Sequence, residues 1–233
     1  PHQADLIGIS LSSKIGKACY IPVGHKSNKN INKDQALKKL KPLLEDPSIK
    51  KIGQNIKFDF IVLFKHGIKI TSMEDTMLMS YVLDSGKNRH NMNTLSDIHL
   101  GHKPISFKDL VGTGKKEINF SFVDIEKAKD YAAEDADVTF RLYKKFNKSL
   151  KDEKMINIYE TFEKPMIKIL ADMEIEGIKI DKEFLKILSL KFGKKIEKIQ
   201  SEVFKISKKK FNIASPKQLG EILYNDLKIA DLK

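Results

Sequence analysis

Residues 131–140 read YAAEDADVTF, and this stretch sets a carboxylate against the apolar pattern of a predicted helix. An apolar stripe occupies the same helical face as Asp135, formed by Ala128, Tyr131, Val138 and Leu142. Because such a stripe faces a core, Asp135 should point inward. An unpaired buried carboxylate costs on the order of several kcal/mol unless a cation or hydrogen-bond donors compensate it.

A second carboxylate shows the same conflict. Asp59 interrupts residues 58–64, FDFIVLF, where every other side chain is apolar. Two acids placed against the apolar pattern predict one shared cation site. The alternative is that lysines or helix N-termini satisfy both carboxylates. With Cys19 as the single cysteine, oxygen or histidine ligands must hold any metal.

Composition sets the broad class of the protein. The 233 residues are 41% hydrophobic, enough to build one large domain or two smaller ones. The apolar runs are shorter than the roughly 20 residues that span a bilayer, and we expect a monomeric, cytoplasmic protein without a membrane partner. The net charge of +12 fits a phosphate-binding surface and a solvated lysine coat equally well.

The hydrophobic pattern predicts an α/β fold with a mixed sheet and packed helices, because a hairpin is followed by alternating strands and helices. Expected strands are 6–11, 18–23, 49–52 and 68–70, and expected helices are 34–44, the segment around Asp59, 75–83, 94–100 and 124–150. Residues 84–122 are otherwise predicted as loops. From Asp152 the pattern changes to long amphipathic helices, which predicts a domain boundary there.

Two motifs resemble the second and third exonuclease motifs of the bacterial DNA polymerase I family, the family A polymerases. They are residues 53–59, GQNIKFD, and residues 131–137, YAAEDAD, in matching order and spacing. Residues 75–83, 89–92 and 105–107 are similar to the same proofreading domain, and residues 174–181 and 212–219 resemble the start of the polymerase domain. The resemblance covers essentially the whole chain.

This resemblance implies a fold and an activity. Residues 1–151 would form a ribonuclease-H-like 3′-5′ exonuclease domain, and residues 152–233 the incomplete, α-helical start of a polymerase thumb. The chain would be a fragment of DNA polymerase I that proofreads DNA 3′ ends in replication and repair. Two divalent ions, Mg²⁺ or Mn²⁺, would act as cofactors, for which carboxylates are natural ligands. Its partners would be a single-stranded or frayed 3′ end and primer–template duplex DNA.

The resemblance also implies roles for individual residues. Asp135 would bind metal directly, Asp59 would hold the second ion largely through water, and Tyr131 would orient the attacking water. Six further residues are expected to bind nucleic acid: Gln54, Asn55, Phe58, Arg89, Met92 and Phe107. Alternatives stay open for some of them, because Gln54 and Asn55 could cap the following helix, and Phe58 and Met92 could belong to the core. Glu134 and Asp137 are expected to be solvated.

One part of the family pattern is not found. The family's first motif, an Asp-x-Glu pair on the opening strand, is expected upstream of Pro1 in a longer protein. The predicted sheet therefore lacks its first strand, and we expect this fragment to bind catalytic ions weakly and to cleave poorly. Two alternatives remain: a ribonuclease-D-like exoribonuclease, against which the tail argues, and a catalytically inactive nucleic-acid-binding scaffold.

Overall fold

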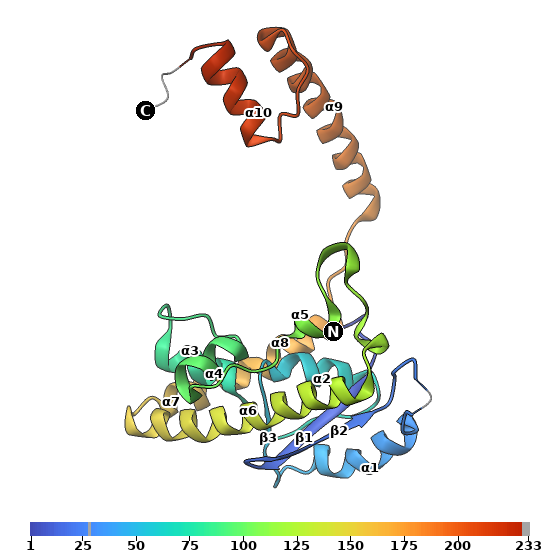
Figure 1. The fold of residues 1–233 in the computed structure, drawn as a ribbon, viewed down its shortest axis with the longest axis vertical. Helices are drawn as coiled ribbons and strands as arrows, with labels where there is room; N and C mark the ends of the chain where they lie inside the picture. Colours follow the sequence, from blue (N-terminus) through green and yellow to red (C-terminus); the bar gives the residue numbers. More distant parts are fainter. Residues whose placement is uncertain (28, 230–233) are drawn as a thin grey trace. The chain divides into compact units, whose positions relative to one another are not determined.

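The computed structural model describes residues 1–27 and 29–229, except for the side chain of Lys115. The chain divides into two compact units, Pro1–Gly177 and Ile178–Lys233, called the first unit and the second unit below. Figure 1 shows their elements. The first unit contains β1 (Gly8–Lys14), β2 (Lys17–Pro22), α1 (Lys33–Glu45), β3 (Lys51–Gly53), α2 (Ile56–Phe64), β4 (Met73–Asp75), α3 (Thr76–Asp84), α4 (Met92–Leu100), α5 (Phe107–Val111), η1 (Gly114–Lys116), η2 (Phe120–Phe122), α6 (Ile125–Asp152), α7 (Ile156–Ile158), η3 (Tyr159–Glu163) and α8 (Lys164–Glu176).

The strands confirm a mixed α/β architecture but do not form one sheet. Strands β1 and β2 pair antiparallel, with Gly8 opposite Pro22. Strands β3 and β4 pair in parallel, with Lys51 opposite Met73. In the described residues these are two separate two-stranded sheets, whereas the sequence predicted a single mixed sheet lacking its first strand.

The order of elements follows the hydrophobic pattern, with differences at their ends. The expected strand at residues 68–70 is wrong: Ile68 and Ile70 are buried, but the strand that pairs with β3 begins only at Met73. Helix α1 begins one residue before the expected start at 34 and is capped by Asn32, whose side chain accepts the Gln35 amide. The predicted loop at 84–122 contains α4 as expected, and also the short α5, η1 and η2.

Helix α6 is the scaffold of the first unit. It packs against β1 and β2 and against α3 and α4 (Figure 1). One core cluster forms along this helix and includes Leu142, Phe146 and Leu150, all essentially inaccessible to solvent. A second cluster forms around α2 and includes Phe60 and Ile61. The two helices that carry the acids of interest are therefore held by separate cores.

The compact first unit extends beyond the domain boundary expected after residue 151. Tyr159 in η3 is fully buried in the α6 cluster. Helix α8 packs against α2 and buries Ile167 and Ala171. It ends before Gly177, which adopts a φ of 74° that glycine tolerates at no steric cost. Because segments that follow residue 151 pack into the first unit, its C-terminal end lies at Gly177.

The second unit consists of helices joined by short connections. Helix α9 (Lys182–Ser207) is capped by Asp181, whose side chain accepts the Phe184 amide at 2.9 Å. Helix α10 (Pro216–Gly220) is capped by Ser215 and is followed by η4 (Glu221–Asp226). Among the described residues, none of the helices has the length and apolarity required to cross a membrane.

Leu142→Ala tests the core along α6. Leu142 is 0% exposed, so removing its side chain should destabilise the protein by about 2–5 kcal/mol through lost burial and a cavity. Urea unfolding followed by circular dichroism measures the change. Leu43→Ala on α1, where the leucine is 42% exposed, is the matched control and should cost much less. Equal losses in the two variants would contradict the assigned core.

Candidate active site

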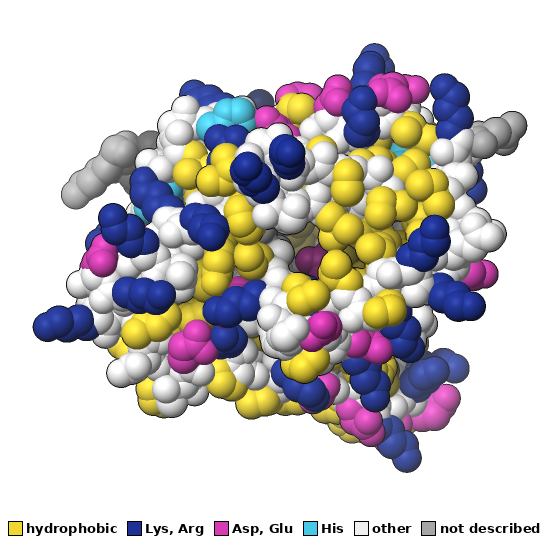
Figure 2. Space-filling view, turned by 90° about the horizontal axis from the view of Figure 1, so that it is seen from below, with side chains coloured by type: hydrophobic (Ala, Val, Ile, Leu, Met, Phe, Trp, Pro, Cys, Tyr) yellow, Lys and Arg dark blue, Asp and Glu magenta, His cyan; other side chains and the backbone are white. Residues whose placement is uncertain are grey.

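The two acids predicted to share a site do face the same space. Asp59, from the first turn of α2, and Asp135, from α6, line one cavity of about 1370 Å³. Its walls also include residues of β1 and of β3, so the cavity lies between the two sheets. A hollow bordered by hydrophobic side chains, with an acidic side chain inside it, is visible in Figure 2. The prediction that Asp59 and Asp135 lie together is confirmed.

The other predicted site residues divide into two groups. Gln54, Phe58, Met92, Phe107 and Tyr131 line the cavity with the two acids. Asn55 and Arg89 do not line it, and both are exposed. The structure therefore brings together most, but not all, of the predicted set.

Asp135 carries the clearest sign of an incomplete site. Its Oδ1 atom is buried and has no hydrogen-bond partner among the described residues. Burial raises the pKa of Asp135 to about 6, although the hydroxyl of Tyr131, one helical turn earlier, opposes the rise. A divalent cation would compensate this oxygen, so the acid fits a metal ligand.

Asp59, on α2, lines the same cavity as Asp135. The residue is accessible to solvent there. Protein atoms nevertheless surround its carboxyl group, and this burial raises its pKa to about 7. The negative charge of Asp75 raises the pKa further. In the described part of the chain, no group of three or more His, Cys, Asp or Glu side chains forms a ready metal site. Asp59 and Asp135 both line the cavity, and Asp5 is a further acidic residue of its lining.

Tyr131 belongs to an aromatic cluster at the cavity wall. Its ring centroid lies 6.0 Å from that of Phe107 and 6.1 Å from that of Phe120, and the Phe107 and Phe120 rings stack at 5.8 Å. Burial is the main reason that the pKa of the Tyr131 hydroxyl is raised, with the charge of Asp135 second. Phe107 stays 46% exposed, which leaves surface for a stacked base.

Phe120 is a site residue that the sequence did not reveal. It also lines the cavity, and its ring lies 5.7 Å from that of His25. The buried His25 ring fixes this region, since Nδ1 donates to the Val123 carbonyl at 3.1 Å and Nε2 lies 2.6 Å from the Tyr20 hydroxyl. A phenylalanine in an apolar stretch gives no chemical signal in the sequence, so only the fold reveals its position.

Gln54 and Asn55 shape the turn that enters α2. The Gln54 amide is used within the protein, because its oxygen accepts from Thr76 Oγ1 at 2.5 Å and its nitrogen donates to the His90 carbonyl at 2.7 Å. The alternative that the Asn55 side chain caps α2 is not found, although Asn55 occupies the N-cap position. Asn55 has a left-handed φ of 60° and its side chain makes no capping bond; Asp75 accepts its amide instead.

The acids beside Asp135 are not solvated as expected. Glu134 accepts from His102 Nε2 at 2.8 Å and from the Ile105 amide at 2.6 Å. Asp137 accepts from the Gly16 amide and from Arg141 Nε, both at 2.6 Å. These contacts tie the loop before Phe107 and the hairpin turn to α6, so they fix the rim of the cavity.

Sequence comparison assigns the family. The model of the 3′-5′ exonuclease domain of A-type DNA polymerases matches residues 1–151. The chain belongs to this family. Dependence on divalent metal ions is a general property of such exonuclease domains, and the two carboxylates at the cavity agree with it.

Relatives share nearly the full length of the chain. It is 40% identical over 97% of its residues to the DNA polymerase I of Rhizobium leguminosarum and 39% identical over 97% to that of Pseudomonas aeruginosa. It covers 24% and 26% of those proteins, so it spans about a quarter of their length.

Solved structures agree on the fold. The POL domain of Pol1 from M. smegmatis, in complex with DNA primer-template and dNTP, matches 91% of this chain and 33% of its own, with a TM-score of 0.65 at 22% identity. The apo form of a nuclease matches 75% of this chain and 79% of its own, with a TM-score of 0.58 at 21% identity. At these identities the likeness concerns the fold alone, and it is consistent with a ribonuclease-H-like first unit.

The raised carboxyl pKa values predict a pH-dependent stability of the metal-free protein. The folded state keeps the protons of Asp59 and Asp135 up to a pKa of about 7 and about 6, whereas the unfolded chain releases them near 3.8. Stability contributed by these groups is therefore present at low pH and lost as the pH rises toward 7. Asp59→Asn and Asp135→Asn should raise Tm in chelator by roughly 2–5 °C at pH 8, and less at pH 5.

Differential scanning fluorimetry at the two pH values measures this effect. Asp130→Asn is the control, because Asp130 lies on the same helix with a side chain that is 66% exposed, and it should leave Tm nearly unchanged. A gain in Tm that is larger at pH 5 than at pH 8 would contradict the expected direction of the pH dependence.

Proposed function

We propose that the first unit is the proofreading 3′-5′ exonuclease of a bacterial DNA polymerase I, acting on DNA 3′ ends in replication and repair. One observation carries the proposal: Asp59 and Asp135 converge on one cavity, where a buried carboxylate oxygen has no hydrogen-bond partner among the described residues. Residues 152–233 would form the incomplete start of the polymerase domain, in its thumb region. The polymerase active site would then lie outside this chain.

Asp135 and Asp59 would hold two divalent ions, Mg²⁺ or Mn²⁺. When bound, such ions stabilise the attacking and leaving oxygens of phosphodiester hydrolysis. Tyr131 orients the attacking water. Its hydroxyl keeps its proton at neutral pH, because burial raises its pKa, and it can therefore both donate to and accept from a water molecule.

The cavity wall suits an unstacked 3′-terminal nucleotide. Phe58 and Phe107 are 43% and 46% exposed and offer apolar faces for a base, next to the half-buried Met92. Gln54 and Asn55 would touch the terminal nucleotide, and the exposed Arg89 would bind a backbone phosphate. A mismatched end reaches the single-stranded form at lower free energy than a paired end, which gives the preference for errors.

Two other functions are possible for this fold, and each can be distinguished from DNA proofreading. A ribonuclease-D-like exoribonuclease would use the same carboxylates, but the chain's similarity to DNA polymerases runs through residues 152–233 as well. A catalytically inactive scaffold would keep the fold without the chemistry. The presence of Asp59, Tyr131 and Asp135 at one cavity favours the enzyme.

Cleavage of a labelled single-stranded 3′ end tests the proposal, using the full-length gene product with Mg²⁺ or Mn²⁺. Asp135→Asn and Asp59→Asn should lower the cleavage rate by about 100- to 1000-fold, since each removes a carboxylate that holds an ion. Tyr131→Phe should lower it by roughly 10- to 100-fold. We expect the 233-residue chain alone to cleave weakly, because Asp59 and Asp135 are its two expected metal ligands, whereas the family's first motif would supply further carboxylates.

Asp130→Asn provides the matched control on α6 and should cleave like the wild type, as its side chain is exposed. A DNA and an RNA oligonucleotide of one sequence are compared. Faster cleavage of RNA would support the exoribonuclease. Absence of cleavage of either by a folded, Mn²⁺-binding protein would support the scaffold, and unchanged rates in Asp135→Asn would reject the assigned site.

A further inference from the structure

The carboxylate of Asp75 does not line the cavity and is held differently from those of Asp59 and Asp135. Asp75, at the end of β4, is 1% exposed and has a full set of donors. Its Oδ2 accepts the Ile56 amide at 2.9 Å, and its Oδ1 accepts the Asn55 amide at 3.0 Å and the Met77 amide at 2.9 Å. One buried side chain therefore caps the N-termini of both α2 and α3.

This capping controls how α2 begins. Asn55 enters the helix in the left-handed region, at a φ of 60°, and its own side chain supplies no cap. The first amides of a helix have no partner within it, so α2 depends on Asp75 for two of them. Asp59 lies in the first turn that these two bonds fix. The position of Asp59 at the cavity thus follows from the position of Asp75.

Asp75 is itself anchored from the segment that follows residue 151. Its amide donates to the Tyr159 hydroxyl at 2.9 Å, and that hydroxyl donates to Glu74 Oε2 at 3.1 Å. Tyr159 is fully buried. A buried amide left without an acceptor destabilises the fold, so the hydroxyl holds the β4 backbone at the point where Asp75 begins α3.

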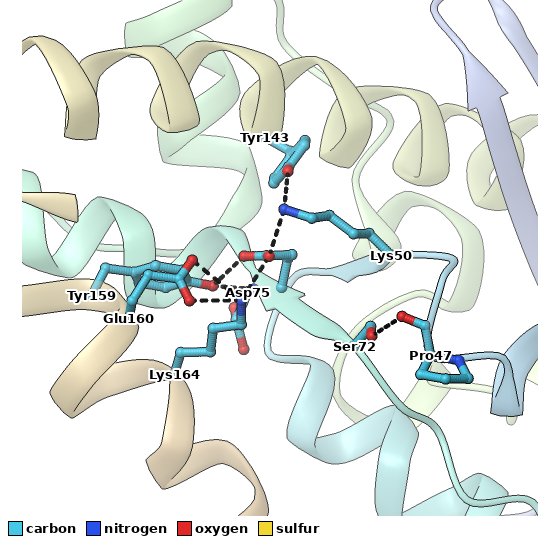
Figure 3. A network of polar contacts seen from close by, with 9 residues as sticks. Pro47, Lys50, Ser72, Asp75, Tyr143, Tyr159, Glu160 and Lys164 are labelled. Carbon is cyan, nitrogen blue, oxygen red and sulfur yellow. Dashed lines mark hydrogen bonds and ion pairs between the residues drawn. The ribbon is translucent and has the colours of Figure 1, made fainter. Parts of the chain in front are cut away.

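Glu74, which accepts from the Tyr159 hydroxyl, is itself paired with two lysines. Its side chain is 3% exposed, and Oε1 lies 2.8 Å from Lys164 Nζ of α8 and 3.2 Å from Lys50 Nζ. Lys50 Nζ in turn donates to the Tyr143 hydroxyl of α6 at 3.5 Å. Figure 3 shows Tyr159 and Lys164 beside Asp75, with Lys50 and Tyr143 on the other side. The paired lysines make the burial of Glu74 tolerable.

We propose that Asp75 is a positioning residue for Asp59, and that Tyr159, from outside the region matched by the exonuclease family, anchors it. The inference rests on the proposed function for its consequence in catalysis. Asp75 touches no substrate in this scheme and acts only through the first turn of α2. Residues 152–177 are then part of the nuclease machinery, although the family match ends at residue 151.

Amide hydrogen exchange in the full-length protein tests the anchor without any metal. Asp75→Asn keeps one side-chain acceptor of two, so the Asn55 or the Ile56 amide should exchange at least tenfold faster. Tyr159→Phe removes only a hydroxyl, and the Asp75 amide should exchange at least tenfold faster. Asp181→Asn alters the cap of α9 in the second unit and is the matched control, with unchanged exchange at all three amides.

Metal binding and kinetics test the positioning. Asp75→Asn should weaken Mn²⁺ binding about tenfold and lower kcat for a single-stranded DNA 3′ end about tenfold, while KM changes less than twofold. Tyr159→Phe should likewise weaken Mn²⁺ binding and lower kcat, each about threefold, while KM changes less than twofold. If Asp75→Asn does not fold, the result for Tyr159→Phe decides whether the positioning role holds.

The outcomes separate this inference from the proposed function. Unchanged exchange, or faster exchange with unchanged Mn²⁺ affinity and kcat, overturns the positioning role. If the wild-type protein cleaves no DNA, the proposed function fails, and the Mn²⁺ affinity of the variants still decides: a tenfold loss supports the role of Asp75, and no loss overturns it.

Discussion

Two carboxylates held beside one cavity by separate apolar cores form the constraint on which the first unit depends. Asp59 is carried by the cluster around α2 and Asp135 by the cluster along α6. Moving either acid out of the cavity would expose the apolar face of its helix, which costs more than the desolvation of the acid can recover. The cores therefore keep the two charges together.

Asp75 shows what a compensated carboxylate looks like in the same fold. It is 1% exposed, and three amides at the N-termini of α2 and α3 donate to it. Burial still raises the pKa of the Asp75 carboxyl, and these amides oppose the rise. Asp135 has a buried oxygen without such donors in the described part of the chain. This contrast within one structure separates a structural acid from one that fits a cation.

Polar bonds to α6 hold two irregular segments at the cavity, the loop between α4 and α6 and the hairpin turn. Both strand pairs are short or irregular, and the loop between α4 and α6 contains only brief helical turns. Glu134 and Asp137 bind this loop and the hairpin turn to α6, and Lys145 donates to the His99 carbonyl at 2.5 Å. One long helix thus supplies both the reactive face and the bonds that position the residues opposite it.

Helical periodicity and contiguous motifs are local properties, so the amino-acid sequence was enough to predict most elements in their order, the two inward acids and the family. It identified Asp59, Tyr131 and Asp135 correctly as neighbours of one cavity. The separate two-stranded sheets, the packing of Phe120 on Tyr131 and the capping of two helices by Asp75 depend on partners distant in the chain, so they were found from the folded structure. The extent of the compact unit was likewise decided by Tyr159 and α8, whose burial no local pattern encodes.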